Sequence, residues 1–274
     1  MELPKYRKFA AIMEARTDEE IGGKVRNVHV AEIHEEPMPE MGPRDVMLKM
    51  ETCQICTTDY QHWLGLREHQ GFPMAGGHEW SAIVIAKGED VIGFNVGDRV
   101  GPVHGGCGEC LNCRRGRSFA CTGKARHNGP VNGFLGARGF ANYGVLPETS
   151  LVRLSNDLDP QVAGFIEPIA TCVCGMRRLR VQPGETVVII GAGAMGIANA
   201  QVAHAFGARV IISELSPKKL ERARSMGFAD VIDATKVDPV EEVMRLTNGY
   251  GADAVIAAVG LGAAYKQGYA MLKR

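Results

Sequence analysis

Several features are missing from this 274-residue sequence, and each absence excludes a class of protein. The N-terminus, "MELPKYRKFAAIMEARTDEE", lacks the apolar core of a signal peptide, and no apolar run is long enough to span a bilayer. The 31 Lys and Arg residues balance the 31 Asp and Glu residues, so the chain as a whole is not attracted to nucleic acid or to anionic membranes. We therefore expect a cytoplasmic protein that binds neither nucleic acid nor a membrane.

Glycine and cysteine are the residue types that stand out. The chain has 34 glycines, several in adjacent pairs, which is typical of a turn-rich β domain and of a dinucleotide-binding loop. Four of the eight cysteines fall within "CGECLNCRRGRSFAC", residues 107–121. In a reducing compartment such clustering is more typical of metal ligands than of disulfides.

The first part of the chain reads as a compact antiparallel β domain. Short apolar runs bounded by turn residues predict strands at "DVMLKME", "SAIVIAK", "DRVGPV" and "ANYGVL". After them, "PQVAGFIEPIATCVCGMRRL" has apolar residues at helical spacing. We expect a β domain over residues 1–160 and a helix over residues 161–180.

The remainder, residues 181–274, alternates strands with helices. Strands are predicted at "TVVIIG", "RVIIS", "ADVID" and "ADAVIAAVG", and helices between them, one of which opens at Ser216 with Pro217 in its first position. This alternation is typical of a doubly wound parallel sheet, so the expected fold class is α/β. Dinucleotide-binding sheets usually have about six strands and four are predicted here, so we expect the second domain to be incomplete.

The four clustered cysteines, Cys107, Cys110, Cys113 and Cys121, are spaced C-x2-C-x2-C-x7-C. Four thiolates in one loop suit a closed tetrahedral Zn²⁺ site that stabilises a loop without a core of its own. A bacterial iron–sulfur run begins alike but places its fourth cysteine after three residues and before proline, whereas Thr122 follows here. A nucleic-acid-binding zinc module is disfavoured because "RRGR" has no aromatic platform or basic helix beside it. We expect a structural zinc lobe over residues 105–122.

A glycine-rich turn follows the first strand of the second part, in "VVIIGAGAMG". Its glycines would permit a tight turn, close approach of the backbone to a pyrophosphate, and close packing of helix on strand. The acidic Glu214 ends the next strand, where it can accept hydrogen bonds from the adenosine ribose and repel a 2′-phosphate. This favours NAD over NADP, although nearby Arg209, Lys218 and Lys219 could soften the preference. The expected loop contacts are Gly191, Gly193, Ala194, Met195 and Gly196.

A second group of potential metal ligands lies in "CQICTTDYQHW" and, about twenty residues later, in "GGHEWS". A catalytic zinc needs three protein ligands and one open position. Cys56, His78 and a carboxylate would meet that requirement. Each could instead be a buried thiol or a turn histidine, but a cofactor fold downstream favours a metal site.

Together these motifs resemble the zinc-dependent medium-chain dehydrogenase/reductase superfamily, which includes alcohol, sorbitol (polyol) and threonine dehydrogenases. The resemblance extends over the whole chain in order, through "ICTTD", "GHE", the four cysteines, "GARGFANYGVLP", "IEPIATCVCG" and "GAGAMG". It implies a GroES-like catalytic domain followed by a Rossmann NAD-binding domain. It also implies that the family continues beyond residue 274, so that the chain is C-terminally truncated and would form a homodimer or homotetramer once completed.

The resemblance also implies roles for individual residues. Cys56 and His78 match the constant catalytic-zinc ligands, and Glu167 or Glu79 supplies the third, a choice the sequence leaves open. Thr58 matches the hydroxyl that takes the alcohol proton. Two further matches concern the cofactor: Thr171 would face the nicotinamide, and Lys219 would reach the adenosine ribose.

Other positions depart from the family pattern. The family often has a histidine where Gln61 stands, so the proton would pass either through His62 or directly to water. Cys53, Cys172 and Cys174 match no ligand position, and we expect them to be buried free thiols.

With Cys56 the only sulfur among the expected catalytic ligands, the donor set is hard, which favours the polyol branch. The expected reaction is therefore NAD-linked oxidation of a polyol, an inositol or another secondary alcohol. The alternatives are a threonine-type amino-alcohol dehydrogenase and a non-catalytic zinc-binding fragment.

Overall fold

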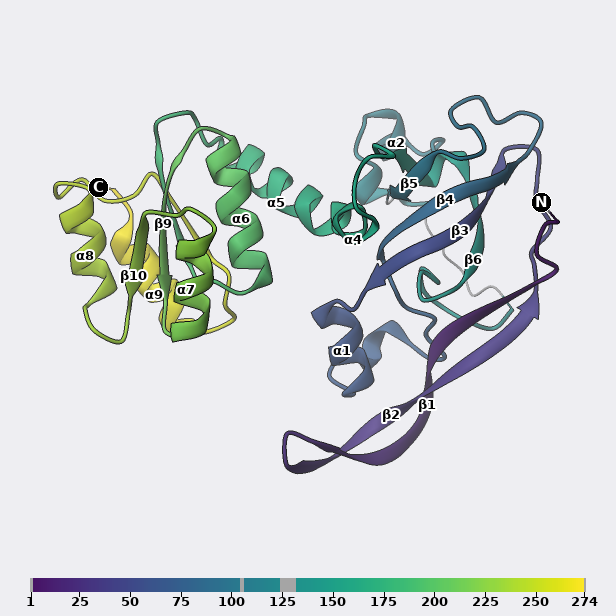
Figure 1. Cartoon of the computed structure of the whole chain (residues 1–274), viewed down its shortest axis with the longest axis horizontal. Helices are drawn as coiled ribbons and strands as arrows, with labels where there is room; N and C mark the ends of the chain where they lie inside the picture. The colour runs from purple at the N-terminus through teal and green to yellow at the C-terminus, as the bar shows by residue number, and fades with distance from the viewer. Residues whose placement is uncertain (1, 104–105, 124–131, 274) are drawn as a thin grey trace. The chain divides into compact units, whose positions relative to one another are not determined.

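The computed structural model describes residues 2–103, 106–123 and 132–273 (Figure 1). The chain divides into two compact units, Met1–Glu167 and Pro168–Arg274. None of the helices in the described part of the chain combines the length and the apolar character needed to cross a bilayer.

The first unit contains a five-stranded antiparallel sheet in the order β6-β3-β4-β5-β7. Its strands are β3 (Asp45–Gln54), β4 (Glu79–Lys87), β5 (Arg99–Pro102), β6 (Tyr143–Pro147) and β7 (Leu151–Arg153). The first four coincide with the predicted strands, so the expected antiparallel β domain is confirmed. Short helices lie in the connections: α1 (Thr57–Trp63), η1 (Glu68–Gln70), α2 (Leu111–Arg114), η2 (Ser118–Ala120), η3 (Glu148–Ser150) and α4 (Pro160–Gly164).

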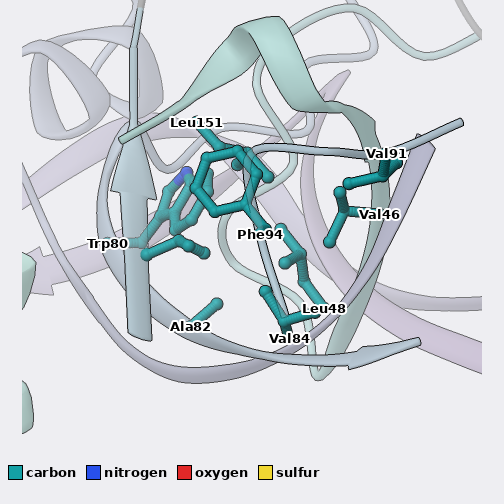
Figure 2. Close-up of a cluster of buried hydrophobic side chains, with 9 residues drawn as sticks. Val46, Leu48, Trp80, Ala82, Val84, Val91, Phe94 and Leu151 are labelled. Carbon is teal, nitrogen blue, oxygen red and sulfur yellow. The ribbon is translucent and has the colours of Figure 1, made fainter. Parts of the chain in front are cut away.

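The core of this unit lies on one face of the sheet. Because side chains alternate along a strand, Trp80, Ala82 and Val84 of β4 point to the same side, where they meet Val46 and Leu48 of β3. Figure 2 shows the Phe94 ring in the middle of this cluster, with Leu151 near one end and Val91 near the other. These side chains are at most 7% exposed, so they fix the sheet from which the site loops emerge.

A long hairpin, β1 (Tyr6–Ile21) and β2 (Lys24–Pro37), was not among the predicted strands. Its two-residue turn is Gly22-Gly23, and both residues have positive φ, as a tight hairpin turn requires. The outer half has charged residues on both faces and is largely exposed, so it lacks the apolar alternation that predicts a strand. The glycine pair was the one available signal.

The second unit is a four-stranded parallel sheet in the order β10-β9-β8-β11. The strands are β8 (Thr186–Ile190), β9 (Arg209–Glu214), β10 (Asp230–Asp233) and β11 (Ala254–Ala257). The helices are α5 (Ile166–Leu179), α6 (Ala194–Ala205), α7 (Pro217–Ser225), α8 (Pro239–Leu246) and α9 (Gly262–Met271). The α/β fold class and all four predicted strands are therefore confirmed.

The segment expected to form one interdomain helix over residues 161–180 forms two helices, α4 and α5, which are separated at Phe165. Pro168 explains the break. Proline has no N–H to donate to the carbonyl of residue 164, and its ring crowds that carbonyl, whereas the first turn of a new helix tolerates it.

Candidate functional site

The four clustered cysteines converge on one point in the first unit. The sulfur atoms of Cys107, Cys110, Cys113 and Cys121 all lie within 4.8 Å of one another. The Sγ atoms of Cys110 and Cys121 are 3.8 Å apart. A set of four sulfurs at these separations fits a tetrahedral Zn²⁺ ion.

The backbone of the lobe favours thiolates at this cluster. The N–H groups of Cys107 and Gly123 each donate to Cys121 Sγ at 3.3 Å, and the N–H of Cys110 donates to Cys107 Sγ at 3.3 Å. Backbone donors lower the pKa of Cys110 to about 5 and also lower that of Cys121, whereas burial and the neighbouring sulfurs raise the pKa of Cys113 to about 12. A Cβ atom at Gly106 would overlap Cys113 Sγ, so glycine is needed for the sulfurs to converge.

A second cluster, also in the first unit, lies where β3 leads into α1 and a glycine loop leads into β4. Cys56 is the residue immediately before α1, and His78 immediately precedes β4. The ligand atoms of Cys56, Asp59 and His78 lie within 4.8 Å of one another. The antiparallel pairing of Gln54 with Glu79 brings these two segments together.

His78 also belongs to a third group of potential ligands. Its ring nitrogens and the carboxylates of Glu79 and Glu167 all lie within 4.8 Å of one another. His78 Nε2 is 3.9 Å from Glu79 Oε1, which is too long for a hydrogen bond but suits two groups facing a common ion. The two groups share His78 and together offer one sulfur, one imidazole and three carboxylates; we call them the mixed cluster. The sequence singled out Cys56, His78, Glu79 and Glu167 of this cluster.

The Cys56 thiol needs a cation to ionise at neutral pH. Burial raises the pKa of Cys56, and the neighbouring Glu79 carboxylate raises it further, while hydrogen bonds from Thr58 lower it. A divalent cation would reverse that balance, because coordination deprotonates a thiol. The donor set and its spacing therefore fit zinc.

Asp59 is the site residue to which sequence reasoning gave no role. Its Oδ2 accepts the N–H of Cys56 at 3.0 Å and its Oδ1 accepts the N–H of Gly77 at 3.3 Å. The carboxylate thus ties the backbone beside Cys56 to the backbone beside His78, and both its oxygens are already engaged. Its position three residues after Cys56, in the first turn of α1, was the sequence signal for such a capping contact.

The loop before His78 depends on a glycine. Gly77 has φ of 86°, and a Cβ there would approach the backbone nitrogen of Phe140 to 2.6 Å and Cys53 Sγ to 2.8 Å. Burial raises the pKa of Cys53 to about 12, so this thiol stays protonated beside the site. Any side chain at Gly77 would displace His78 from the cluster.

His62 lies away from solvent. It is 1% exposed, its Nδ1 lies 3.1 Å from the carbonyl oxygen of Arg67, and its ring packs on Phe72. This burial does not favour His62 as the group that passes a proton to water. Of the three cysteines expected to be buried thiols, Cys172 is buried and Cys53 is only partly buried. Cys174 is exposed on α5, so that prediction was wrong for Cys174.

In the second unit, the glycine-rich turn joins β8 to the N-terminus of α6. Gly191 has φ of 96°, which a residue with a side chain rarely adopts. A Cβ at Gly196 would overlap the carbonyl oxygen of Gly191, whereas a Cβ at Gly193 would meet nothing within 4 Å. Space is therefore open at the helix N-terminus, where unpaired N–H groups favour a phosphate.

Glu214 ends β9 beside this turn. Its Oε2 accepts the N–H of Ala192 at 2.7 Å, and its Oε1 accepts the N–H groups of Leu215 and Ser216 at 2.7 and 2.9 Å. Burial alone would raise the pKa of Glu214, but these donors outweigh it and the net pKa is lowered. Lys219 Nζ lies 4.0 Å from Glu214 Oε2.

The remaining expected cofactor residues also belong to the second unit. Ala194 and Met195 are exposed in the first turn of α6. Thr171 is exposed on α5, and its hydroxyl donates to the carbonyl of Pro168 at 2.7 Å.

Comparison with known protein families gives two matches. Residues 42–156 match the alcohol dehydrogenase GroES-like domain, and residues 194–274 match the zinc-binding dehydrogenase family. The first match contains Cys56, His78 and the four clustered cysteines, and the second begins at Ala194 in the glycine-rich turn.

Similar proteins carry dehydrogenase names. A sorbitol dehydrogenase of Halalkalibacterium halodurans is 33% identical over 88% of this chain and 70% of its own length. An L-threonine 3-dehydrogenase of Bacillus subtilis is 35% identical over 88% of this chain and 69% of its own length. A zinc-binding dehydrogenase of Sinorhizobium meliloti, solved with NADP, superposes with a TM-score of 0.76 at 29% identity, over 97% of this chain and 74% of that one.

Proposed function

The chain belongs to the zinc-dependent medium-chain dehydrogenase/reductase superfamily, and from that premise we propose that it oxidises a secondary alcohol of the polyol class to the ketone, with NAD as the hydride acceptor. At the level of the family it is an oxidoreductase that uses zinc and a nicotinamide dinucleotide. The choice of alcohol, the preference for NAD and the roles of individual residues are our proposals.

The observation that carries the proposal is that His78 belongs to two groups of potential ligands, one with Cys56 and Asp59 and the other with Glu79 and Glu167. A closed set of four sulfurs has no position for a substrate, whereas this mixed set can hold a metal and leave one position open. One sulfur beside an imidazole and two carboxylates makes a hard donor set, which suits substrates rich in hydroxyl oxygen. The similarity to a sorbitol dehydrogenase supports the same branch.

We assign the residues as follows. Cys56 and His78 hold the catalytic metal, with Glu167 or Glu79 as the third ligand, and Asp59 holds the two loops in register. A zinc ion bound there would act as a Lewis acid and lower the pKa of a substrate hydroxyl. Thr58, half-buried beside Cys56, would accept the proton that the hydroxyl releases while its own hydroxyl proton passes to water. The four-cysteine cluster holds the structural zinc and stabilises its lobe.

The second unit binds the dinucleotide. The cofactor, when bound, supplies the hydride acceptor. The glycine-rich turn receives the pyrophosphate, and Thr171 and Lys219 contact the nicotinamide and the adenosine ribose. Glu214 uses three of its roughly four acceptor positions on backbone N–H groups, which leaves one for a ribose hydroxyl. Its charge would repel a 2′-phosphate, so we propose NAD although one similar structure contains NADP.

Metal analysis combined with an NADH titration tests the function. We expect two zinc ions per chain, saturable NADH binding, and NAD reduction that is faster with sorbitol or myo-inositol than with ethanol. One zinc ion and no NADH binding would instead support a non-catalytic zinc-binding chain. Faster reduction with L-threonine than with either polyol would favour the amino-alcohol alternative, which the similarity to L-threonine 3-dehydrogenases motivates.

Replacing Glu214 by glutamine should weaken NADH binding about tenfold and reduce the preference for NADH over NADPH at least tenfold. The amide NH₂ would face one of the backbone N–H donors that now converge on the carboxylate, and leaving such a donor unpaired costs about 1–3 kcal/mol. Fluorescence titration with each nucleotide measures both effects.

The matched control is Glu221→Gln on the exposed face of α7, which removes the same charge away from the turn. It should leave both affinities unchanged. Equal losses in the two variants would mean that net charge, and not the Glu214 contacts, sets the preference.

A further inference from the structure

A bulge interrupts the pairing of β1 with β2 partway along the hairpin. Ile12 pairs with Ala31 and Arg16 pairs with His29, so three residues of β1 lie opposite a single residue of β2. Such a bulge leaves carbonyl groups without partners in the ladder. His29 compensates for this, because its Nδ1 lies 3.0 Å from the carbonyl oxygen of Met13 and 3.1 Å from that of Glu14. The ring is 2% exposed and is thereby fixed in the hairpin.

Charged groups hold the other side of the His29 ring. Its Nε2 is 3.2 Å from the guanidinium of Arg16 and 3.0 Å from Glu68 Oε1, and Arg16 also pairs with Glu68. These groups line a cavity of about 470 Å³. A Cβ at Gly65 would overlap the Arg16 guanidinium, so the Arg16 side chain reaches the second residue beyond the C-terminal end of α1.

Three rings connect the hairpin to α1. Phe72 lies between two histidines, with its centroid 4.1 Å from the His29 ring and 4.6 Å from the His62 ring. His62 lies near the end of α1, while Cys56 and Thr58 lie at its beginning. Figure 1 shows α1 beside the hairpin. The stack therefore holds the C-terminal end of α1, opposite to the end beside Cys56.

His62, at the α1 end of this stack, is an unusual residue for a buried position. Its Nδ1 donates to the Arg67 carbonyl, so in the neutral ring Nε2 carries the lone pair, and this atom is buried without a hydrogen-bond partner in the described part of the chain. Burial lowers the pKa of His62, so the ring stays neutral. A leucine would not bury a polar atom in this way, so the contribution of His62 must come from its ring stacking and from its bond to Arg67.

We propose that the His29–Phe72–His62 stack, fixed by Arg16 and Glu68, is a positioning unit that sets the orientation of α1 and thereby places Cys56 and Thr58. Its effect on turnover rests on the proposed function, but its effect on α1 does not. A seven-residue helix is too short to be stable alone, so its orientation depends on such contacts. Because both histidines stack on one phenylalanine, displacement of that ring would release α1 from the hairpin.

The test is amide hydrogen exchange of residues 57–63 in the purified chain, compared among four variants. Phe72→Leu and His62→Leu remove a ring from the stack, and both should speed exchange in α1 at least tenfold. His62→Phe keeps a ring and should stay within threefold of the parent chain. Phe9→Leu removes a buried ring from the separate cluster formed with Phe134, and it should leave α1 unchanged.

Two results would overturn the proposal. One is exchange in α1 that rises no more in Phe72→Leu than in Phe9→Leu. The other is equal damage from His62→Phe and His62→Leu, which would assign the effect to the Arg67 hydrogen bond alone. Should Phe72→Leu not fold, the two His62 variants still decide between these results.

Turnover separates this proposal from the proposed function. We expect kcat to fall in Phe72→Leu and His62→Leu with KM for NAD unchanged, since the second unit is untouched. If no alcohol is oxidised but exchange in α1 behaves as expected, then the function fails and the positioning unit stands. Normal turnover with unchanged exchange in both variants would reject the positioning unit and leave the function intact.

Discussion

Replacing Cys56 by alanine is expected to remove one of two zinc ions per chain and to lower kcat/KM at least about a thousandfold, with the fold preserved. Cys56 supplies the only sulfur of the mixed cluster, and its loss leaves His78 and the carboxylates to hold the ion. A correctly held metal contributes several kcal/mol to stabilisation of the developing charge, which is the basis of the expected loss. Zinc content, turnover with a polyol and the circular dichroism spectrum of the variant measure the three expectations.

Cys53→Ala is the matched control, because Cys53 is a partly buried cysteine three residues away. Among the described residues Cys53 belongs to none of the groups of converging potential ligands, so we do not expect it to bind the metal. We expect this variant to keep both zinc ions and most of its activity. If Cys56→Ala kept both ions, or if it unfolded the chain, our division into a catalytic and a structural site would be wrong.

Replacing Cys121 by alanine is expected to remove the other zinc ion and to destabilise the lobe. Cys121 is the most buried of the four cysteines, and its sulfur accepts two backbone N–H groups that would then be left without an acceptor. Structural zinc contributes directly to folding, because the ligands converge only when the metal holds them. We expect one zinc ion per chain, a lower melting temperature and new protease cleavage within residues 106–123.

The control for this variant is Cys174→Ala, which changes an exposed cysteine on α5. It should leave the zinc content and the protease pattern as they are. A Cys121→Ala chain with two zinc ions would show that three cysteines suffice, and one with none would show that the lobe supports the mixed cluster as well. In the second case the two sites could not be treated as independent.

Local patterns in the sequence predicted those parts of the fold whose residues are close in the chain. The strands of the five-stranded sheet are short apolar runs bounded by turn residues, and the parallel strands are short apolar runs between helices, so both were recognisable. The β1–β2 hairpin was not, because the outer half of its ladder carries charges on both faces and is stabilised mainly by main-chain pairing. Neither the His29–Phe72–His62 stack nor the bulge beneath it has a sequence pattern.

The sequence likewise predicted only some of the residues of the candidate site. The spacing of the four cysteines is enough by itself to indicate metal ligands, whereas the motifs around Cys56 and His78 indicate them only together with the cofactor fold downstream. The role of Asp59 depends on a contact with Gly77, a residue of another loop. The spacing of Asp59 after Cys56 predicts only its contact with the backbone N–H of Cys56. The exposure of Cys174 was wrongly predicted because a cysteine within an apolar helix gives no indication of which face it occupies.

The two metal clusters differ in how far apart their ligands lie along the chain, and this difference affects how a newly made protein acquires its metals. The sulfurs of the lobe come from positions 107–121, whereas the mixed cluster draws on positions 56–167. Since the entropy of closing a loop grows with the logarithm of its length, assembling the mixed cluster from an unfolded chain costs about 2 kcal/mol more. On the proposed assignment, we expect the lobe to take up zinc as a local event during synthesis, and the mixed cluster to bind its metal only once β3, β4 and the segment around Glu167 are in place. Under zinc limitation, chains with a filled lobe and no catalytic metal would then accumulate first.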